Sequence, residues 1–319
     1  MGKYSLHPLR VRLGHALHGL AARVLRQEAP KTWSDAALHP TIPDETLLAD
    51  LAKAVENDQL TLVYQPKLNA RTNQIDAVEA LLRWHHPVAG SIAPADFIPW
   101  AERHGVIRQV TQWVLRTTIR DQADLAARGY PLMFSVNLSG RLVGDRDFTR
   151  WTLEACGKAV GPIGLEITET AVIDGTESAL DNLHAYADAG IRVAIDDYGA
   201  GLSSLAYLRK LPASELKIDK MFISTLVSSH RDPLLVRSTI DLAHALEMEV
   251  TAEGVETAMA LSLLRVMGCD LIQGYEVSRP LPLQDLRDFL EAWTAELNAP
   301  RADSRSAVSL HPTVRWRTA

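Results

Sequence analysis

The stretch IRVAIDD, residues 191–197, carries an apolar segment directly into two adjacent carboxylates, Asp196 and Asp197. Other apolar stretches along the chain also end in polar or ionisable residues. These endings are Gln65, Glu79 with Arg83, Asn137, Glu166 with Glu169, Lys217 with Asp219, Glu253 with Glu256, and Gln273. The strands of a (β/α)8 barrel deliver their last residues to one mouth, where such enzymes keep their chemistry. The pattern therefore predicts an α/β fold of the TIM-barrel type.

Strand-like and helix-like segments alternate along the chain after residue 44, as such a barrel requires. The expected strands are 60–66, 75–84, 132–137, 163–167, 191–196, 215–219, 249–253 and 270–273. Helical periodicity covers 45–56, 97–104, 110–128, 179–189 and 234–246. Asp44 is placed to cap the first of these helices.

Side chains alternate along a strand, so residues that share a face can be read from the sequence. Glu79 and Arg83 share one face of their strand, and Lys217 and Asp219 share one face of theirs. Each pair fits inward-pointing residues near the top of a barrel. The mouth of the barrel is therefore expected to be lined with charged groups.

The acids at the mouth raise the question of a metal. Carboxylates that converge repel one another unless a cation lies between them. Two adjacent acids at a strand end, such as Asp196 and Asp197, can hold two metals side by side. Asp197 is expected to reach the mouth because the chain turns at Tyr198 and Gly199. A divalent metal site is therefore the first hypothesis.

Each of these motifs alone also has a purely structural interpretation. An Asp-Asp pair before Gly is often a turn or a cap. The stretch EGVE at 253–256 can cap the helix that follows it. Lys217 can be a surface lysine whose ammonium reaches solvent. The joint placement of the motifs at successive strand ends favours a functional site.

Length and composition set further bounds. The 319 residues, 47% of them hydrophobic, fit one large barrel with flanking segments, and the formal net charge of -6 argues against a polynucleotide partner. No apolar stretch is long enough to cross a bilayer. The two cysteines, Cys156 and Cys269, are expected to be buried thiols in a reducing compartment. We therefore expect a cytoplasmic protein.

Three segments are expected: a basic amphipathic helix and linker at 1–43, the barrel domain at 44–296, and a disordered tail at 297–319. The helix pattern at 6–28 has an apolar stripe that must be buried somewhere. Packing on the barrel, a dimer partner, an upstream sensor and an anionic membrane surface all remain open, the last because of its basic residues. A regulatory role for this segment is the interpretation we favour.

At the motifs described above, the sequence resembles the EAL-domain cyclic-di-GMP phosphodiesterases of bacteria. The namesake triplet stands at Glu79-Ala80-Leu81, inside EALLRWHHP. The rest of the family pattern follows in order: YQPK at 64–67, VNLS at 136–139, EITET at 166–170, DDYGAG at 196–201, LKID at 216–219, AEGVET at 252–257 and QGY at 273–275. The similarity runs from about residue 44 to about residue 296.

The resemblance implies a modified TIM barrel whose first strand is antiparallel to the rest. It implies hydrolysis of cyclic di-GMP to linear pGpG with two divalent cations, Mg2+ or Mn2+, with Ca2+ as an inhibitor, and a homodimer. A catalytically silent cyclic-di-GMP receptor is the alternative.

The resemblance also assigns roles to single residues. Glu79, Asn137, Glu166 and Asp196 resemble ligands of the first metal, and Asp196 with Asp197 resembles the second site. Glu253 matches the general base, Lys217 the residue that steers the attacking water, and Glu169 the glutamate that holds the loop after residue 197. Substrate contacts are implied for Gln65, Leu82, Arg83, Asp219, Glu256 and Gln273.

That loop is where the chain departs from the family pattern. The usual pattern resembles DDFGTGYSS, whereas residues 196–204 read DDYGAGLSS. Ala200 removes a hydroxyl and Leu202 removes an aromatic ring. We expect these two changes to affect the packing of the loop and its coupling to a dimer.

Overall fold

The computed structural model describes residues 44–169, 171, 177–199 and 208–298. The helix expected at 6–28, the linker after it and residues 299–319 of the expected tail lie outside the described residues, as does the side chain of Asp44. The domain boundaries given above therefore stay predictions.

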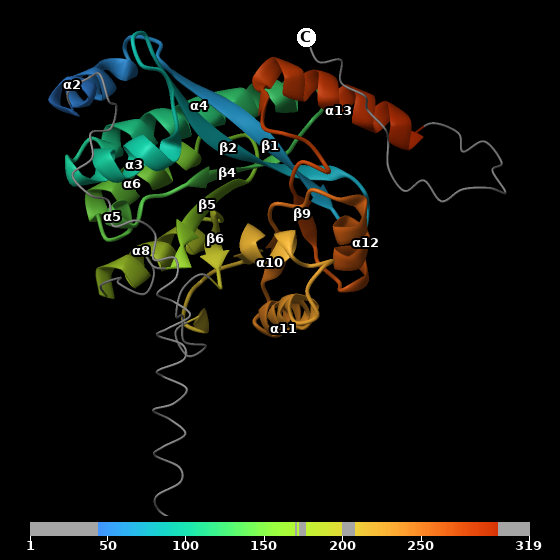
Figure 1. Ribbon diagram of the computed structural model, residues 1–319. Helices are drawn as coiled ribbons and strands as arrows, with labels where there is room; N and C mark the ends of the chain where they lie inside the picture. The colour runs from blue at the N-terminus through green and yellow to red at the C-terminus, as the bar shows by residue number, and fades with distance from the viewer. Residues whose placement is uncertain (1–43, 170, 172–176, 200–207, 299–319) are drawn as a thin grey trace, which may run out of the picture. The chain divides into compact units, whose positions relative to one another are not determined.

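Eight strands close into a barrel within the described residues (Figure 1). In order around the barrel they are β1 (Leu60–Asn69), β2 (Ile75–His86), β4 (Met133–Asn137), β5 (Ile163–Thr168), β6 (Arg192–Tyr198), β7 (Glu215–Ile218), β8 (Glu249–Ala252) and β9 (Leu271–Gln273). Strand β9 pairs with β1 and closes the ring. Every expected strand is present, so the fold predicted from the strand endings is confirmed.

The first strand runs against its neighbours. β1 is antiparallel to β2, with Gln65 opposite Glu79, and antiparallel to β9, with Lys67 opposite Gln273. The link between β1 and β2 is only residues 70–74, and a link this short joins antiparallel strands, whereas parallel strands need a long crossover. The remaining neighbours, from β2 round to β9, pair in parallel. The antiparallel first strand is confirmed.

Two short strands and a set of helices complete the described fold. β3 (Gly90–Ile92) pairs antiparallel with β2, and β10 (Leu281–Pro282) pairs antiparallel with β1. The helices are α2 (Asp44–Ala54), α3 (Pro94–Arg103), α4 (Ile107–Ala127), α5 (Gly140–Val143), α6 (Arg146–Cys156), α8 (Glu177–Asp188), α10 (Lys220–Ser224), α11 (Asp232–Ala245), α12 (Ala258–Val266) and α13 (Leu283–Asn298). All five helices expected from periodicity are present, with ends shifted by a few residues.

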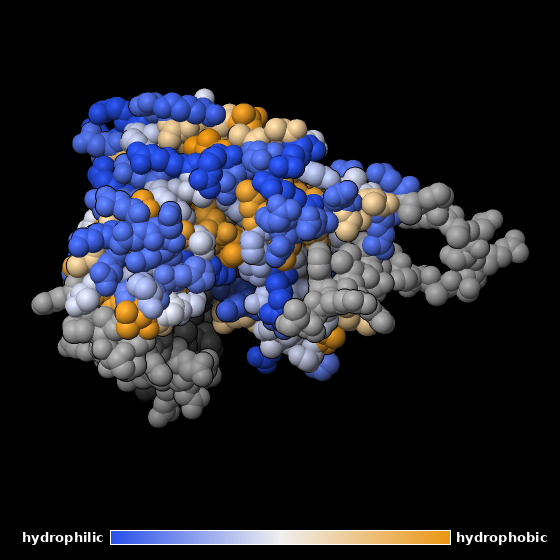
Figure 2. All heavy atoms as spheres, turned by 90° about the horizontal axis from the view of Figure 1, so that it is seen from above, coloured by the Kyte–Doolittle hydropathy of each residue, from blue (hydrophilic) through white to orange (hydrophobic). Residues whose placement is uncertain are grey.

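The helices are amphipathic, as α13 illustrates. Its buried residues Leu286, Phe289, Leu290 and Trp293 recur at spacings of three and four, which is the period of one helix face. Figure 2 shows mostly hydrophilic residues on the face of the molecule seen from above, with smaller hydrophobic areas between them. Among the described residues, no helix combines the length and the apolar character that crossing a membrane requires.

The parallel register carries the polar strand endings to one mouth. Asn137 pairs with Glu166, and Thr168 pairs with Asp196, so successive strands end at similar heights. The apolar residues before these endings are buried, which anchors each strand in the core. The barrel therefore fixes the backbone from which the polar side chains project.

Candidate functional site

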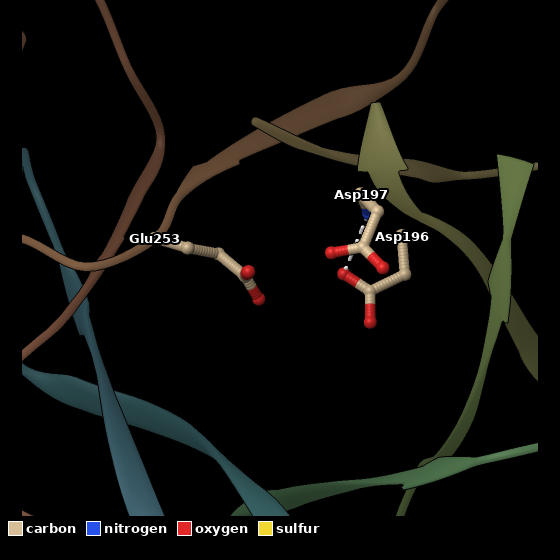
Figure 3. Close-up of side chains that lie close together, drawn as sticks. All are labelled: Asp196, Asp197 and Glu253. Atoms are coloured by element: carbon tan, nitrogen blue, oxygen red, sulfur yellow. Dashed lines mark hydrogen bonds between the residues drawn. The ribbon is translucent and has the colours of Figure 1, made fainter. Parts of the chain in front are cut away.

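Four barrel strands bring acidic side chains to the same mouth. Glu79 lies on β2, Glu166 on β5 and Asp196 with Asp197 on β6, and Glu253 directly follows β8. Figure 3 shows the carboxylates of Asp196 and Asp197 on one side of the mouth and that of Glu253 pointing toward them from the other. One ligand atom from each of these three residues lies within 4.8 Å of the other two. The expected convergence of acids is therefore present.

A local irregularity lets two consecutive acids face the mouth. The pairing of β6 with β7 shifts register between Ile195 and Tyr198, and Asp197 has a φ of 56°. A bulge of this kind breaks the alternation that would send adjacent side chains to opposite faces. The backbone N–H of Asp197 donates to Oδ1 of Asp196 at 3.0 Å. The change of direction that we expected at Tyr198 and Gly199 thus begins at Asp197, inside the strand.

Lys217 lies at the centre of the acids and is fully buried. Its Nζ atom is 2.6 Å from Glu253 Oε1, 3.0 Å from Asp196 Oδ1 and 3.5 Å from Glu79 Oε2, and it also pairs with Glu166. An ammonium shared in this way reduces the repulsion between the carboxylates. The interpretation of Lys217 as a surface lysine is therefore wrong.

Glu79 is fixed by two side-chain amides. Asn137 donates from Nδ2 to Oε1 of Glu79 at 2.7 Å, and Gln273 donates from Nε2 to Oε2 at 2.7 Å. The same amide nitrogen of Gln273 lies 3.1 Å from Oε1 of Gln65. Oε1 of Gln273 is buried and has no hydrogen-bond partner among the described residues. One acceptor in the site is thus available to a ligand or water.

The carboxyl groups of the site have widely separated pKa values. Burial would raise the pKa of Glu166, but the ammonium groups of Lys217 and Lys67 together outweigh it and lower that pKa to about 2. Burial raises the pKa of Glu253 to about 8. Burial and the neighbouring Asp196 raise the pKa of Asp197 to about 6. Titratable groups pushed apart in this way are characteristic of functional sites.

The donor set fits divalent cations. Glu79, Asn137, Glu166, Asp196 and Asp197 offer only oxygen ligands, which suit hard ions such as Mg2+ and Mn2+. The carboxylates outnumber the single ammonium that they share, so the mouth retains negative charge for a cation to balance. The chemistry of these residues is therefore that of a site for a hard metal ion.

An open pocket of about 290 Å³ lies beside the acids. Its wall consists of Gln65, Glu79, Asp196, Lys220, Glu253, Gly254, Glu256, Gln273, Gly274 and Tyr275. It thus brings together three of the expected substrate contacts, Gln65, Glu256 and Gln273. The other three, Leu82, Arg83 and Asp219, do not line this pocket.

Arg83 and Asp219 have local partners of their own. Nη1 of Arg83 donates to the carbonyl oxygen of Leu82 at 2.8 Å. Burial lowers the pKa of Arg83, and the nearby Tyr275 partly offsets that effect. Asp219 accepts the backbone N–H of Met221 at 2.6 Å and so caps α10. Asp219 therefore has a structural role that sequence reasoning did not assign.

Glu169 holds the last described residue before the gap at 200–207. Its side chain is buried, and Oε2 accepts the backbone N–H of Gly199 at 3.1 Å. The loop-holding role that the resemblance implies for Glu169 stays a prediction. Ala200 and Leu202, the positions where the chain departs from the family pattern, lie outside the described residues.

Several residues of the site were missed by sequence reasoning. Lys220 and Tyr275 line the pocket. Lys67 and Glu215 are buried inside the barrel, where Lys67 pairs with both Glu215 and Glu166. The available signal was Lys67, the charged residue of the strand segment VYQPKL at 63–68. A buried lysine needs an anionic partner, but the strand pattern alone does not say which one.

A protein family and several known proteins are similar to this chain. The EAL domain family matches residues 48–280. Cyclic di-GMP phosphodiesterase NbdA of Pseudomonas aeruginosa is 40% identical over 255 residues, which cover 79% of this chain and 33% of NbdA. MucR of the same organism, a bifunctional diguanylate cyclase/cyclic di-GMP phosphodiesterase, is 38% identical over 244 residues, which cover 75% of this chain and 36% of MucR. The chain spans about a third of the length of these curated relatives.

A solved structure has a similar fold. The structure of the PaMucR phosphodiesterase in complex with c-di-GMP superposes with a TM-score of 0.71 at 37% sequence identity. The similarity covers 76% of this chain and 99% of that one. Since the family match also extends over most of the chain, this protein belongs to the EAL domain family.

Proposed function

We propose that this chain hydrolyses cyclic di-GMP to linear pGpG, as a phosphodiesterase that depends on two divalent cations, Mg2+ or Mn2+. One observation carries the proposal: Lys217 lies in a single barrel mouth among four carboxylates from different parts of the barrel. The names of the similar proteins NbdA and MucR support the substrate.

The proposed cation ligands are Glu79, Asn137, Glu166, Asp196 and Asp197. When bound, two such ions supply positive charge that stabilises the attacking and leaving oxygens of an in-line displacement at phosphorus. The chain contributes oxygen donors from four strands, β2, β4, β5 and β6, held at fixed positions by the barrel. This arrangement is what phosphodiester hydrolysis requires of the protein.

Glu253 is the proposed general base. Its carboxylate would accept a proton from the attacking water, and the ammonium of Lys217, 2.6 Å from Oε1, would orient that water. A general base works best when its pKa lies near the working pH. Burial raises the pKa of Glu253 to about 8, which meets that condition.

Three of the proposed substrate contacts, Gln65, Glu256 and Gln273, stand in the wall of the pocket. Gln65 and Gln273 offer amide groups, and the planar guanidinium of Arg83 can grip a phosphate or a carbonyl oxygen as a fork. The remaining contacts are Leu82, Asp219 and Glu256.

A turnover assay tests the proposal. The full chain is incubated with cyclic di-GMP and Mg2+ or Mn2+, and the products are separated by chromatography. We expect pGpG, and we expect EDTA to stop its formation. Calcium should permit binding but inhibit turnover, because its looser coordination suits two-metal geometry poorly. Binding of cyclic di-GMP without product at micromolar enzyme would favour the rival function, a silent receptor.

The proposal also includes the oligomeric state, the cellular location and the role of residues 6–28. We expect a homodimer that acts in the cytoplasm. The two unpaired thiols, Cys156 and Cys269, fit such a reducing compartment. Residues 6–28 would regulate the barrel through a partner, an upstream sensor or a membrane surface. Deleting residues 1–40 should leave hydrolysis detectable but change its rate or the oligomeric state. A deletion variant that does not fold would make the segment structural and the regulatory role wrong.

A further inference from the structure

A buried polar cluster lies inside the barrel and touches the acids of the mouth. Lys67, on β1, is completely buried, and its Nζ is 2.8 Å from Oε1 of Glu166, 2.9 Å from Oε1 of Glu215 and 3.3 Å from Oγ of Ser135. Thr251 donates from Oγ1 to the same Oε1 of Glu215 at 2.6 Å. Each of these side chains therefore has a polar partner although none reaches solvent.

Stability alone is a weak reason for such a cluster. The free energy lost when two charges leave water is about as large as the free energy gained from their attraction. Apolar residues of similar volume often stabilise a core equally well. Neither Lys67 nor Glu215 lines the pocket. The cluster contacts the proposed metal ligands at one group, the carboxylate of Glu166.

The two oxygens of Glu166 have different partners. Oε1 accepts from Lys67, and Oε2 accepts from Lys217. Because Lys67 holds Oε1, rotation of the carboxylate would break that contact, so Oε2 stays directed at Lys217 in the mouth.

We propose that Lys67 and Glu215 are positioning residues for the metal centre: together they orient Glu166 so that its outer oxygen is available to a divalent cation. Glu215, which Thr251 holds in turn, fixes the ammonium of Lys67 in the barrel. This inference rests on the metal site of the proposed function. It assigns to the interior of the barrel a role in metal affinity.

The test measures Mn2+ affinity of the full chain by titration calorimetry, without substrate. The main variant combines Lys67→Met with Glu215→Gln, which removes the contact to Glu166 and leaves the net charge of the interior unchanged. We expect this variant to bind Mn2+ about 10- to 100-fold more weakly than the parent, as removal of groups that orient a ligand does. The control is Tyr64→Phe, which removes a buried hydrogen bond from the same strand to Asp121.

The control separates positioning from a structural role. Tyr64→Phe should lower the melting temperature and leave Mn2+ affinity unchanged. If the parent binds Mn2+ and the double variant binds it equally well, the inference is overturned. If the parent itself does not bind Mn2+, the proposed function fails first, and the inference fails with it.

A second variant covers the case in which the double variant does not fold. Thr251→Val is nearly isosteric and removes only the hydrogen bond to Glu215. It should weaken Mn2+ binding in the same direction by a smaller factor. A lower melting temperature with unchanged Mn2+ affinity in Thr251→Val would mean that the cluster only supports the barrel, which overturns the inference.

Discussion

Lys217 and Glu253 are in contact in the barrel mouth, with 2.6 Å between Nζ and Oε1, yet they differ in their access to solvent. The side chain of Lys217 is 1% exposed, whereas that of Glu253 is 20% exposed. Lys217 is also held by three further carboxylates. Glu253 is therefore the member of the pair that entering water can reach, which suits it to accept a proton.

Replacing Glu253 should separate turnover from binding. Glu253→Gln keeps the size of the side chain but cannot accept a proton, so we expect kcat to fall by about 100- to 10,000-fold, with affinity for cyclic di-GMP nearly unchanged. Glu256→Gln, in the wall of the same pocket, should instead raise KM and leave kcat nearly intact. Steady-state kinetics of both variants checks this. Equal kcat in Glu253→Gln and the parent would remove Glu253 from its proposed role.

Asp196 should couple metal binding to stability. A ligand that binds only the folded chain stabilises it, by about 2.7 kcal/mol when its concentration is about 100 times Kd. Mn2+ should therefore raise the melting temperature of the parent, and Asp196→Asn should reduce that rise by removing a carboxylate ligand. Glu291→Gln, an exposed change on α13, should leave the rise intact. The same Mn2+ response in both variants would contradict the assignment of Asp196.

The barrel could be predicted because each strand repeats the same signal, an apolar run that ends in a polar residue. The direction of β1 could not be derived in this way, because alternation along a strand is the same in either direction; it was expected only from the family resemblance. The break at Asp197 was also missed, since it depends on how β6 pairs with β7 and not on the residue types of β6 alone.

The contacts across the barrel were the least predictable part of the site. Lys67 and Glu215 are 148 positions apart, and nothing in either strand identifies the other as its partner. The acids of the mouth were easier to find, because each stands at the end of its own strand. Sequence reasoning thus identified residues by their position on an element but not by their partners on distant elements.

Asp145 allows a test of pH-dependent stability away from the site. It caps α6 by accepting the N–H groups of Asp147 and Phe148 at 3.1 and 2.9 Å, and it pairs with Arg108. Burial would raise the pKa of Asp145, but Phe148 and Arg108 outweigh it and lower that pKa. Asp145→Asn keeps an acceptor for the cap and removes only the charge. At neutral pH we expect a loss of about 0.5–1 kcal/mol in the free energy of unfolding.

The lowered pKa fixes the direction of the pH effect. The charge of Asp145 stabilises the fold fully above the unfolded pKa, which is about 3.9, and this contribution disappears as the pH falls through the lower folded pKa. Urea unfolding of parent and variant should therefore show a gap at pH 7 that closes in the acid range. A gap that stays constant down to the acid limit of folding would contradict the charge-based explanation.

Gly199 should be intolerant of a side chain for two separate reasons. Its φ of 101° is in the region that favours glycine, and an added Cβ would lie 2.6 Å from Cε2 of Phe222. Gly129, with a φ of 92° and nothing within 4 Å of an added Cβ, is a matched control in which only the backbone conformation opposes a side chain.

We expect Gly129→Ala to cost about 1–2 kcal/mol from its backbone conformation. Gly199→Ala should cost about 1–3 kcal/mol more, because Phe222 has to move. Thermal unfolding of the two variants gives this difference, and equal melting temperatures would show that Phe222 adjusts without strain. Because the N–H of Gly199 donates to Glu169, Gly199→Ala should also lower turnover, whereas Gly129→Ala should not.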